Sequence, residues 1–118
     1  MTVLISNLED LKNKVWDNEK PAMLTFGFDW SGKCVIYNWM VDAIEQEFKQ
    51  ACEFFKVEAD QARQLADHYQ VNVFPTSLLL YKGEVKSVSN GIISKAHLRN
   101  NLQDFLSDIE REQLWNRL

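Results

Sequence analysis

The stretch AMLTFGFDWSGKC, residues 22–34, decides the fold. Residues 22–28 are short, continuous and largely apolar, which is typical of a strand buried on both faces. A break of polar and small residues follows at 29–33, and a helix is predicted from about Cys34 to Lys49. Its apolar stripe holds Ile36, Met40, Ile44 and Phe48, widened by Tyr37 and Val41. A buried strand followed at once by such a helix is the building unit of α/β proteins.

Apolar runs and helical stripes alternate along the rest of the chain. Further strands are predicted at 3–5, 51–57, 77–81 and 84–88, the last two joined by a tight turn at Lys82-Gly83. Asn7 is expected to cap a helix that carries Leu8, Leu11 and Val15 on one face. Two more helices are predicted at 60–70 and from about 94 to 109. This order predicts an α/β domain with a central mixed β-sheet flanked by helices on both faces.

Length and composition narrow the class of protein. A chain of 118 residues with a net charge of −4 suits one globular domain and offers no basic surface for nucleic acid. Its apolar runs fall far short of the ~20 residues that cross a bilayer, and no export signal is evident, so a cytoplasmic protein is expected. We assign residues 1–109 to the domain and 110–118 to a helix extension or tail. A monomer or weak dimer is expected. Leu114, Trp115 and Leu118 are unusual in a tail, and a dimer or partner contact is one interpretation of them.

Several motifs occur in the order and spacing of one family. Trp30-Ser31-Gly32-Lys33-Cys34 stands between a strand and a helix, and Val73-Phe74-Pro75-Thr76 precedes a hairpin that contains Lys82-Gly83. Gly91 and Ser94-Lys95 follow. On these residues the chain resembles a thioredoxin from about residue 3 to residue 106, with SGKC in place of the family's CGPC. The resemblance implies the thioredoxin fold, thiol–disulfide exchange on protein or peptide substrates, a cis-proline at Pro75, and a thioredoxin-reductase-type protein as electron donor.

The redox motif lacks one of its two sulfurs. In the family the first cysteine attacks a substrate disulfide and the second resolves the mixed disulfide; here those positions hold Ser31 and Cys34. A serine hydroxyl is a poor nucleophile without a base and forms no disulfide, so the chain as written cannot run a two-cysteine cycle. Cys52 is expected about 20 Å away, at the far end of a strand, which is too distant for the ~7 Å of a disulfide. Ser31 is either a laboratory substitution or a natural divergence.

Other positions also depart from the family. Thr25 stands where many thioredoxins keep a buried aspartate, although the lysine beside it remains as Lys56. Lys33 replaces the proline of the motif, Gly27 replaces an aromatic residue, and Trp39 replaces a helix-kinking proline. These departures favour a divergent natural relative, although active members also vary at the positions of Thr25 and Lys33.

Each site residue has a structural and a functional interpretation. Ser31 is expected to cap the helix through its hydroxyl, and Cys34 is either an inert buried thiol or a reactive monothiol. Trp30, Phe74, Pro75 and Gly91 form either a groove that binds an extended peptide by strand addition or an ordinary exposed rim. His68 and His97 have no partners at metal spacing, so no metal and no cofactor are expected.

Three functions follow from these alternatives. The first is a disulfide oxidoreductase of the thioredoxin type whose attacking cysteine position is occupied by Ser31. The second is a redox-inactive module that binds proteins or peptides at the Trp30, Phe74 and Pro75 surface. The third is a protein that acts through Cys34 alone.

Overall fold

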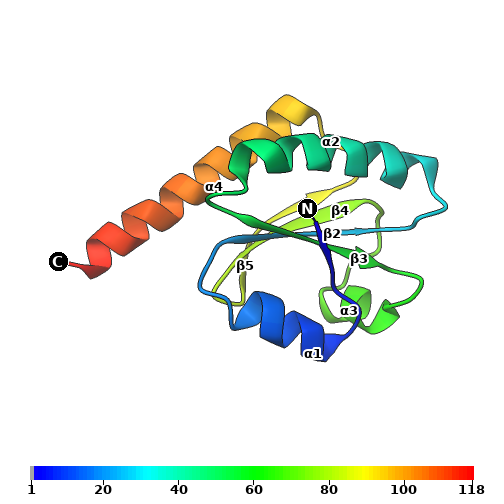
Figure 1. The fold of residues 1–118 in the computed structure, drawn as a ribbon, viewed down its shortest axis with the longest axis horizontal. Helices are drawn as coiled ribbons and strands as arrows, with labels where there is room; N and C mark the ends of the chain where they lie inside the picture. Colours follow the sequence, from blue (N-terminus) through cyan, green and yellow to red (C-terminus); the bar gives the residue numbers. More distant parts are fainter. Residues whose placement is uncertain (1) are drawn as a thin grey trace.

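The computed structural model describes residues 2–118 as one five-stranded mixed sheet with helices on both faces (Figure 1). The strand order is β1-β3-β2-β4-β5, with β1, β2 and β3 parallel and with β4 antiparallel to both β2 and β5. The strands are β1 (Val3–Leu4), β2 (Ala22–Gly27), β3 (Glu53–Glu58), β4 (Thr76–Tyr81) and β5 (Glu84–Asn90). The helices are α1 (Leu8–Leu11), the π-helical η1 (Lys12–Trp16), α2 (Gly32–Phe48), α3 (Arg63–His68) and α4 (Lys95–Asn116). The predicted class and element order are therefore confirmed.

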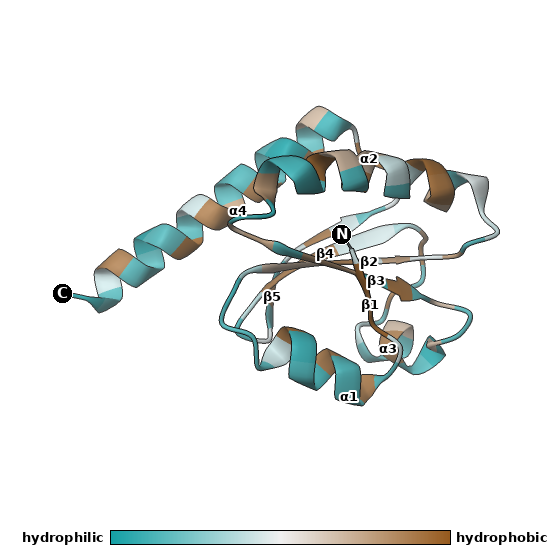
Figure 2. Ribbon diagram, viewed as in Figure 1, coloured by the Kyte–Doolittle hydropathy of each residue, from teal (hydrophilic) through white to brown (hydrophobic). Residues whose placement is uncertain are grey.

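The sheet separates two hydrophobic cores, because alternate residues of a strand point to opposite faces. Leu24, Phe26, Phe55, Leu78 and Leu80 pack with the helices α1, η1 and α3. Met23, Phe54, Leu79 and Tyr81 pack with α2 and α4 on the other face. Figure 2 shows hydrophobic residues concentrated on the central strands, whereas α1 and α4 are mainly hydrophilic. Within residues 2–118, no helix is long and apolar enough to cross a membrane.

The buried faces of two helices differ from the predicted ones. The inward face of α2 carries Cys34, Tyr37, Val41 and Ile44, whereas Ile36 is 60% exposed. The four-residue repeat drifts around the helix because an α-helix has 3.6 residues per turn, so Ile36 and Ile44 do not share a face. Leu8 is also exposed, while Leu11 and Val15 are buried as predicted. The Asn7 cap is confirmed, since its Oδ1 accepts a hydrogen bond from Asp10 N at 2.8 Å.

The last helix continues past the domain boundary suggested by the sequence. Helix α4 runs without interruption to Asn116, and its C-terminal end projects away from the sheet (Figure 1). Ile109 is the last buried residue, and Gln113 Nε2 donates a hydrogen bond to the Tyr81 hydroxyl at 3.2 Å. Leu114, Trp115 and Leu118 are exposed. Residues 110–116 are therefore an extension of the helix rather than a frayed end.

Candidate functional site

Three loops meet at one end of the sheet because of how its strands pair. Phe26 near the end of β2 lies opposite Thr76 at the start of β4, so the loop after β2 lies beside Pro75. Gly27 lies opposite Glu58 at the end of the parallel strand β3, so the loop after β3 joins the same group. The sheet thus brings together Trp30 and Ser31, Phe74 and Pro75, and the segment at residues 59–62.

Three aromatic rings meet on these loops, one exposed and two partly buried. The Phe28 ring stacks on Trp30 with 4.9 Å between centroids and contacts Phe74 at 4.4 Å. Trp30 is 72% exposed, and its indole Nε1 donates a hydrogen bond to Asp60 Oδ2 at 2.5 Å. We call Phe28, Trp30 and Phe74 the aromatic surface. A hollow of about 370 Å³ opens beside it, between Phe28, Phe74 and α3. The Trp30 ring is thus open to solvent and held in place by its neighbours, whereas Phe28 and Phe74 are partly buried beneath it.

Pro75 and Gly91 join the aromatic surface from the side of β4 and β5. The Phe74–Pro75 peptide bond is cis, and Gly91 N donates a hydrogen bond to Pro75 O at 2.7 Å. Gly91 has a φ of +78°, and a Cβ there would meet nothing within 4 Å. Backbone conformation rather than crowding therefore favours glycine at this position. The four residues predicted for a peptide groove thus lie on adjoining loops.

Ser31 begins α2 but does not cap it as predicted. Its backbone is extended, with φ −88° and ψ 121°, and its carbonyl accepts a hydrogen bond from Val35 N at 3.0 Å. The side chain makes no capping bond, so the expected hydroxyl cap is wrong. The Ser31 N–H donates to Phe28 O at 3.2 Å, which fixes the turn before the helix without the hydroxyl. Gly32 and Lys33 follow as exposed residues of the first turn.

Cys34 packs inside the protein, against Gly27. The residue has no exposed surface, and a Cβ built on Gly27 would lie 3.1 Å from Cys34 Sγ and 3.2 Å from Cys34 Cβ. Glycine at position 27 is therefore what allows the thiol to lie so close to β2. Any side chain at position 27 would crowd Cys34 unless one of the two residues shifted.

Cys52 lies at the opposite end of the sheet from Cys34. It precedes Glu53, which pairs with Ala22 at the start of β2, whereas Cys34 contacts Gly27 at its end. Five residues of strand span about 16 Å, so the two thiols cannot form a disulfide in this fold. Both cysteines are free, and burial raises the pKa of Cys52 to about 12. Cys52 does not supply the missing sulfur.

Thr25 and Lys56 form part of a polar row across the sheet, on the side of α2. Thr25 pairs with Lys56 on β3 and with Ser77 on β4. Ser77 shares a hydrogen bond of 2.8 Å with the Tyr37 hydroxyl, but the buried Thr25 Oγ1 has no partner within residues 2–118. A hollow of about 230 Å³ adjoins Thr25, Asn38 and Lys56. A threonine here cannot act as the acid or base that a carboxyl group provides.

Sequence reasoning missed a carboxyl pair under the site. Glu58 is only 8% exposed, and its Oε2 accepts a hydrogen bond from Asp29 N at 3.0 Å. Burial, together with a side-chain hydrogen bond and charge repulsion from Asp29, raises the pKa of Glu58 to about 7. No cluster of three or more His, Cys, Asp or Glu in the described part of the chain could hold a metal ion.

Phe28 and Asp60 were also missed as members of the site. Phe28 reads as the last residue of a buried strand, but β2 ends at Gly27 and the ring turns toward Trp30 and Phe74. Asp60 could have been found from topology, because the loops that follow two adjacent parallel strands must meet.

Comparisons with known proteins place the chain in a family. The Thioredoxin family model matches residues 2–104, so the chain belongs to the thioredoxin family. Thioredoxin of Porphyra purpurea is 27% identical over 96 residues, covering 81% of this chain and 90% of that protein. Thioredoxin of Rickettsia prowazekii is 26% identical over 106 residues, covering 88% and 97%. For the chloroplastic M-type thioredoxin of Spinacia oleracea, 25% identical, the chain spans 60% of the protein's length.

Solved structures agree on the fold. Fasciola hepatica thioredoxin superimposes with a TM-score of 0.81 at 23% identity, covering 88% of this chain and 99% of the other. Thioredoxin from Trypanosoma brucei brucei superimposes with a TM-score of 0.82 at 22% identity, covering 91% and 92%. The thioredoxin fold implied by the sequence motifs is therefore confirmed.

Proposed function

We propose that this chain is a thioredoxin-family module that binds extended protein segments at the aromatic surface and does not run a two-cysteine cycle of its own. The observation that carries the proposal is the contrast between Trp30, which is 72% exposed, and Cys34, which has no exposed surface. The position of the attacking sulfur holds Ser31, whose hydroxyl does not replace a thiolate.

The aromatic surface has the properties of a binding surface. Stacking on Phe28 and the hydrogen bond to Asp60 hold the Trp30 ring, so little side-chain entropy is lost when a partner covers it. In protein interfaces a few residues contribute most of the binding free energy, and tryptophan is enriched among them. The hollow between Phe28, Phe74 and α3 can receive one side chain of the bound segment.

Binding of a thiol-blocked polypeptide tests this proposal. The probe is fluorescently labelled, carboxymethylated insulin B chain, titrated by anisotropy against the full-length protein. Trp30→Ala is expected to weaken binding at least about tenfold, as for an interface hot spot. Cys34→Ala should leave it unchanged. Trp39→Ala is the matched control, because Trp39 is equally exposed on α2 but makes no ring contact with the aromatic surface.

Two results would refute the binding function. One is absence of binding by the unsubstituted chain. The other is an equal loss of affinity in the Trp30 and Trp39 variants, which would indicate a non-specific effect of removing an indole.

A second candidate function, disulfide reduction, is supported by the retained Cys34 at the start of α2. With Ser31→Cys, the new thiolate would attack a substrate disulfide and release one substrate thiolate. The Cys34 thiolate would then attack the mixed disulfide, release the second thiol and leave a disulfide between positions 31 and 34. A thioredoxin-reductase-type protein or dithiothreitol would return both thiols. Mass spectrometry of the oxidised variant should show the loss of two hydrogens, and an unchanged mass would count against this candidate.

Under the binding function the partners are proteins or peptides with an extended segment, and under disulfide reduction they are proteins or peptides that carry thiols or disulfides. A cytoplasmic location and a monomeric or weakly dimeric state remain predictions of the sequence. Gel filtration of the full-length chain at several concentrations tests the second of these.

A further inference from the structure

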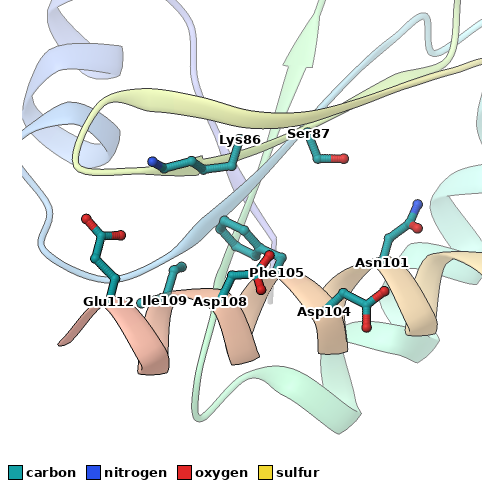
Figure 3. Close-up of a pocket in the computed structure, with 8 residues that line it drawn as sticks. All are labelled: Lys86, Ser87, Asn101, Asp104, Phe105, Asp108, Ile109 and Glu112. Carbon is teal, nitrogen blue, oxygen red and sulfur yellow. The ribbon is translucent and has the colours of Figure 1, made fainter. Parts of the chain in front are cut away.

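A groove separates β5 from α4 on the part of the protein that the proposed function does not use. It has a volume of about 420 Å³. Figure 3 shows β5 running alongside α4, with Lys86 and Ser87 on the strand opposite Phe105, Ile109 and Glu112 on the helix. Phe105 and Ile109 are buried and form its apolar floor. The small side chain of Ser87 leaves the space open on the side of the strand.

One wall of the groove is the free edge of the sheet. Strand β5 is the last in the strand order and, within residues 2–118, pairs only with β4, so one side of its backbone has no strand partner there. Free edges of this kind are the surfaces to which an extended peptide adds as a further strand. The ladder between β4 and β5 shifts register between Leu79 and Leu80, but from Ser87 to Asn90 the pairing is regular.

The other wall is a row of carboxylates on α4. Asp104, Asp108 and Glu112 line the groove at intervals of four residues, and the exposed Trp115 follows three residues later on the same side. Four residues of helix rise about 6 Å. Alternate residues of an extended strand lie about 6.6 Å apart. The spacing of the three carboxylates therefore matches the spacing of side chains on one face of an extended strand that lies along the helix.

The cations already near the groove pair with only one of the three carboxylates of this row. Lys86 lies 3.4 Å from Glu84 Oε1, and Arg111 lies 3.4 Å from Asp108 Oδ1. Asp104 and Glu112 have no ion pair in the part of the chain that the structure describes. The groove thus has excess negative charge over an apolar floor, which suits the aliphatic stem and cationic head of lysine or arginine.

We infer that the groove between β5 and α4 binds an extended segment of a partner protein that carries a lysine or arginine at every second position. The segment adds to the free edge of β5 by backbone hydrogen bonds. Its basic side chains pass over Phe105 and Ile109 to reach Asp104, Asp108 and Glu112. Trp115, exposed beyond the last carboxylate, offers a ring face to a further cation.

A second copy of the chain fits this groove less well than a basic segment. Pairing two β5 edges would bring the two carboxylate rows of α4 toward each other, and like charges repel. The chain also carries a net charge of −4, so it supplies no strongly basic strand of its own. Charge complementarity therefore selects a basic partner.

Peptide binding to the full-length protein tests this inference. The probe is a short synthetic peptide of alternating lysine and threonine, compared by calorimetry with an alternating glutamate and threonine peptide and with a peptide whose lysines are grouped at one end. The alternating lysine peptide should bind most tightly. Asp104→Asn combined with Asp108→Asn should weaken it about tenfold or more, the effect of losing about 1.4 kcal/mol. The matched control is Asp17→Asn combined with Asp42→Asn, which changes net charge equally at exposed sites outside the groove.

Three outcomes would overturn the inference. These are equal binding of the lysine and glutamate peptides, equal weakening by the groove and control variants, and unchanged affinity when alternate backbone amides of the peptide are N-methylated. The last result would exclude strand addition. Trp30→Ala should leave the affinity for the alternating lysine peptide unchanged. Binding in the groove and binding at the aromatic surface can therefore be distinguished.

Discussion

The aromatic surface and the start of α2 differ in how far their side chains are exposed. Trp30 is 72% exposed and held against Phe28, and the partly buried Phe74 completes the aromatic surface beside Pro75. At the start of α2, Ser31 stands in place of an attacking thiol, and the remaining Cys34 is buried against β2. The rings proposed to bind a partner and the positions of the two sulfurs are different residues, so substitutions can test binding and sulfur chemistry separately.

The largest expected effect concerns the thiol of Cys34, at the start of α2. Cys34 has no exposed surface, so a reagent reaches its thiol only when the structure opens. We expect iodoacetamide to alkylate Cys34 at least about a hundredfold more slowly in the folded chain than in guanidinium chloride. Peptide mass spectrometry over time measures this rate, with Cys52 as the internal comparison. Alkylation at the rate of a free thiol would favour a function through Cys34 alone and would show that its thiol is not shielded in the folded chain.

The contact beneath Cys34 gives the next largest effect. Gly27→Val should lower the free energy of unfolding by about 2–3 kcal/mol, because its side chain would overlap Cys34 Sγ. Gly32→Ala is the matched control: a Cβ there meets nothing within 4 Å, and alanine in the first helical turn should be neutral or slightly stabilising. Urea denaturation measures both. Equal stability of the two variants would show that Cys34 is not tightly packed on β2.

The pH dependence of stability tests the carboxyl pair formed by Asp29 and Glu58, which lies beside the aromatic surface. Since the pKa of Glu58 is raised from 4.5 to about 7, the folded chain binds more protons than the unfolded chain between these values. The free energy of unfolding contributed by this group is therefore full below about pH 4.5 and falls as the pH rises through 7, by about 1–3 kcal/mol.

Glu58→Gln should remove most of that fall. Thermal unfolding at several pH values measures it, with Glu110→Gln on the exposed extension of α4 as the control. If the stability of the unsubstituted chain rose across this pH window, the assignment of the raised pKa to Glu58 would be contradicted.

The smallest effect concerns Thr25. Because its buried hydroxyl has no partner, Thr25→Val should be neutral or stabilise the fold by up to about 1 kcal/mol. Ser77→Ala, which removes the hydrogen bond to Tyr37, should instead cost about 1 kcal/mol. A destabilised Thr25→Val variant would mean that the hollow beside it holds a hydrogen-bonding ligand such as water.

Much of the fold could be predicted because hydrophobic patterning reports burial directly. The continuous apolar run at 22–27 is buried between two layers, and the Lys82-Gly83 turn joins β4 to β5. The exposed Ile36 shows where this reasoning fails: a four-residue repeat in the sequence does not say which side of the helix faces the sheet. The π-helical η1 is likewise a local backbone choice that the residues at 12–16 do not reveal.

The sequence predicts which loops carry the candidate residues but not the contacts between them. Trp30, Phe74, Pro75 and Gly91 lie together, yet Phe28, which joins two of the rings, reads as a strand residue. The capping hydroxyl of Ser31 was wrong because backbone groups alone complete the turn before α2. Such contacts depend on distances between loops far apart in the sequence, and propensity contains no information about them.

Reduction of insulin by dithiothreitol tests the central claim, that this chain runs no two-cysteine chemistry because Ser31 stands at the position of the attacking sulfur. The chain with Ser31 should give the rate of dithiothreitol by itself, and Ser31→Cys should exceed it by about tenfold or more. The claim would be contradicted by reduction with the Ser31 chain, or by a Ser31→Cys variant that behaves like its parent.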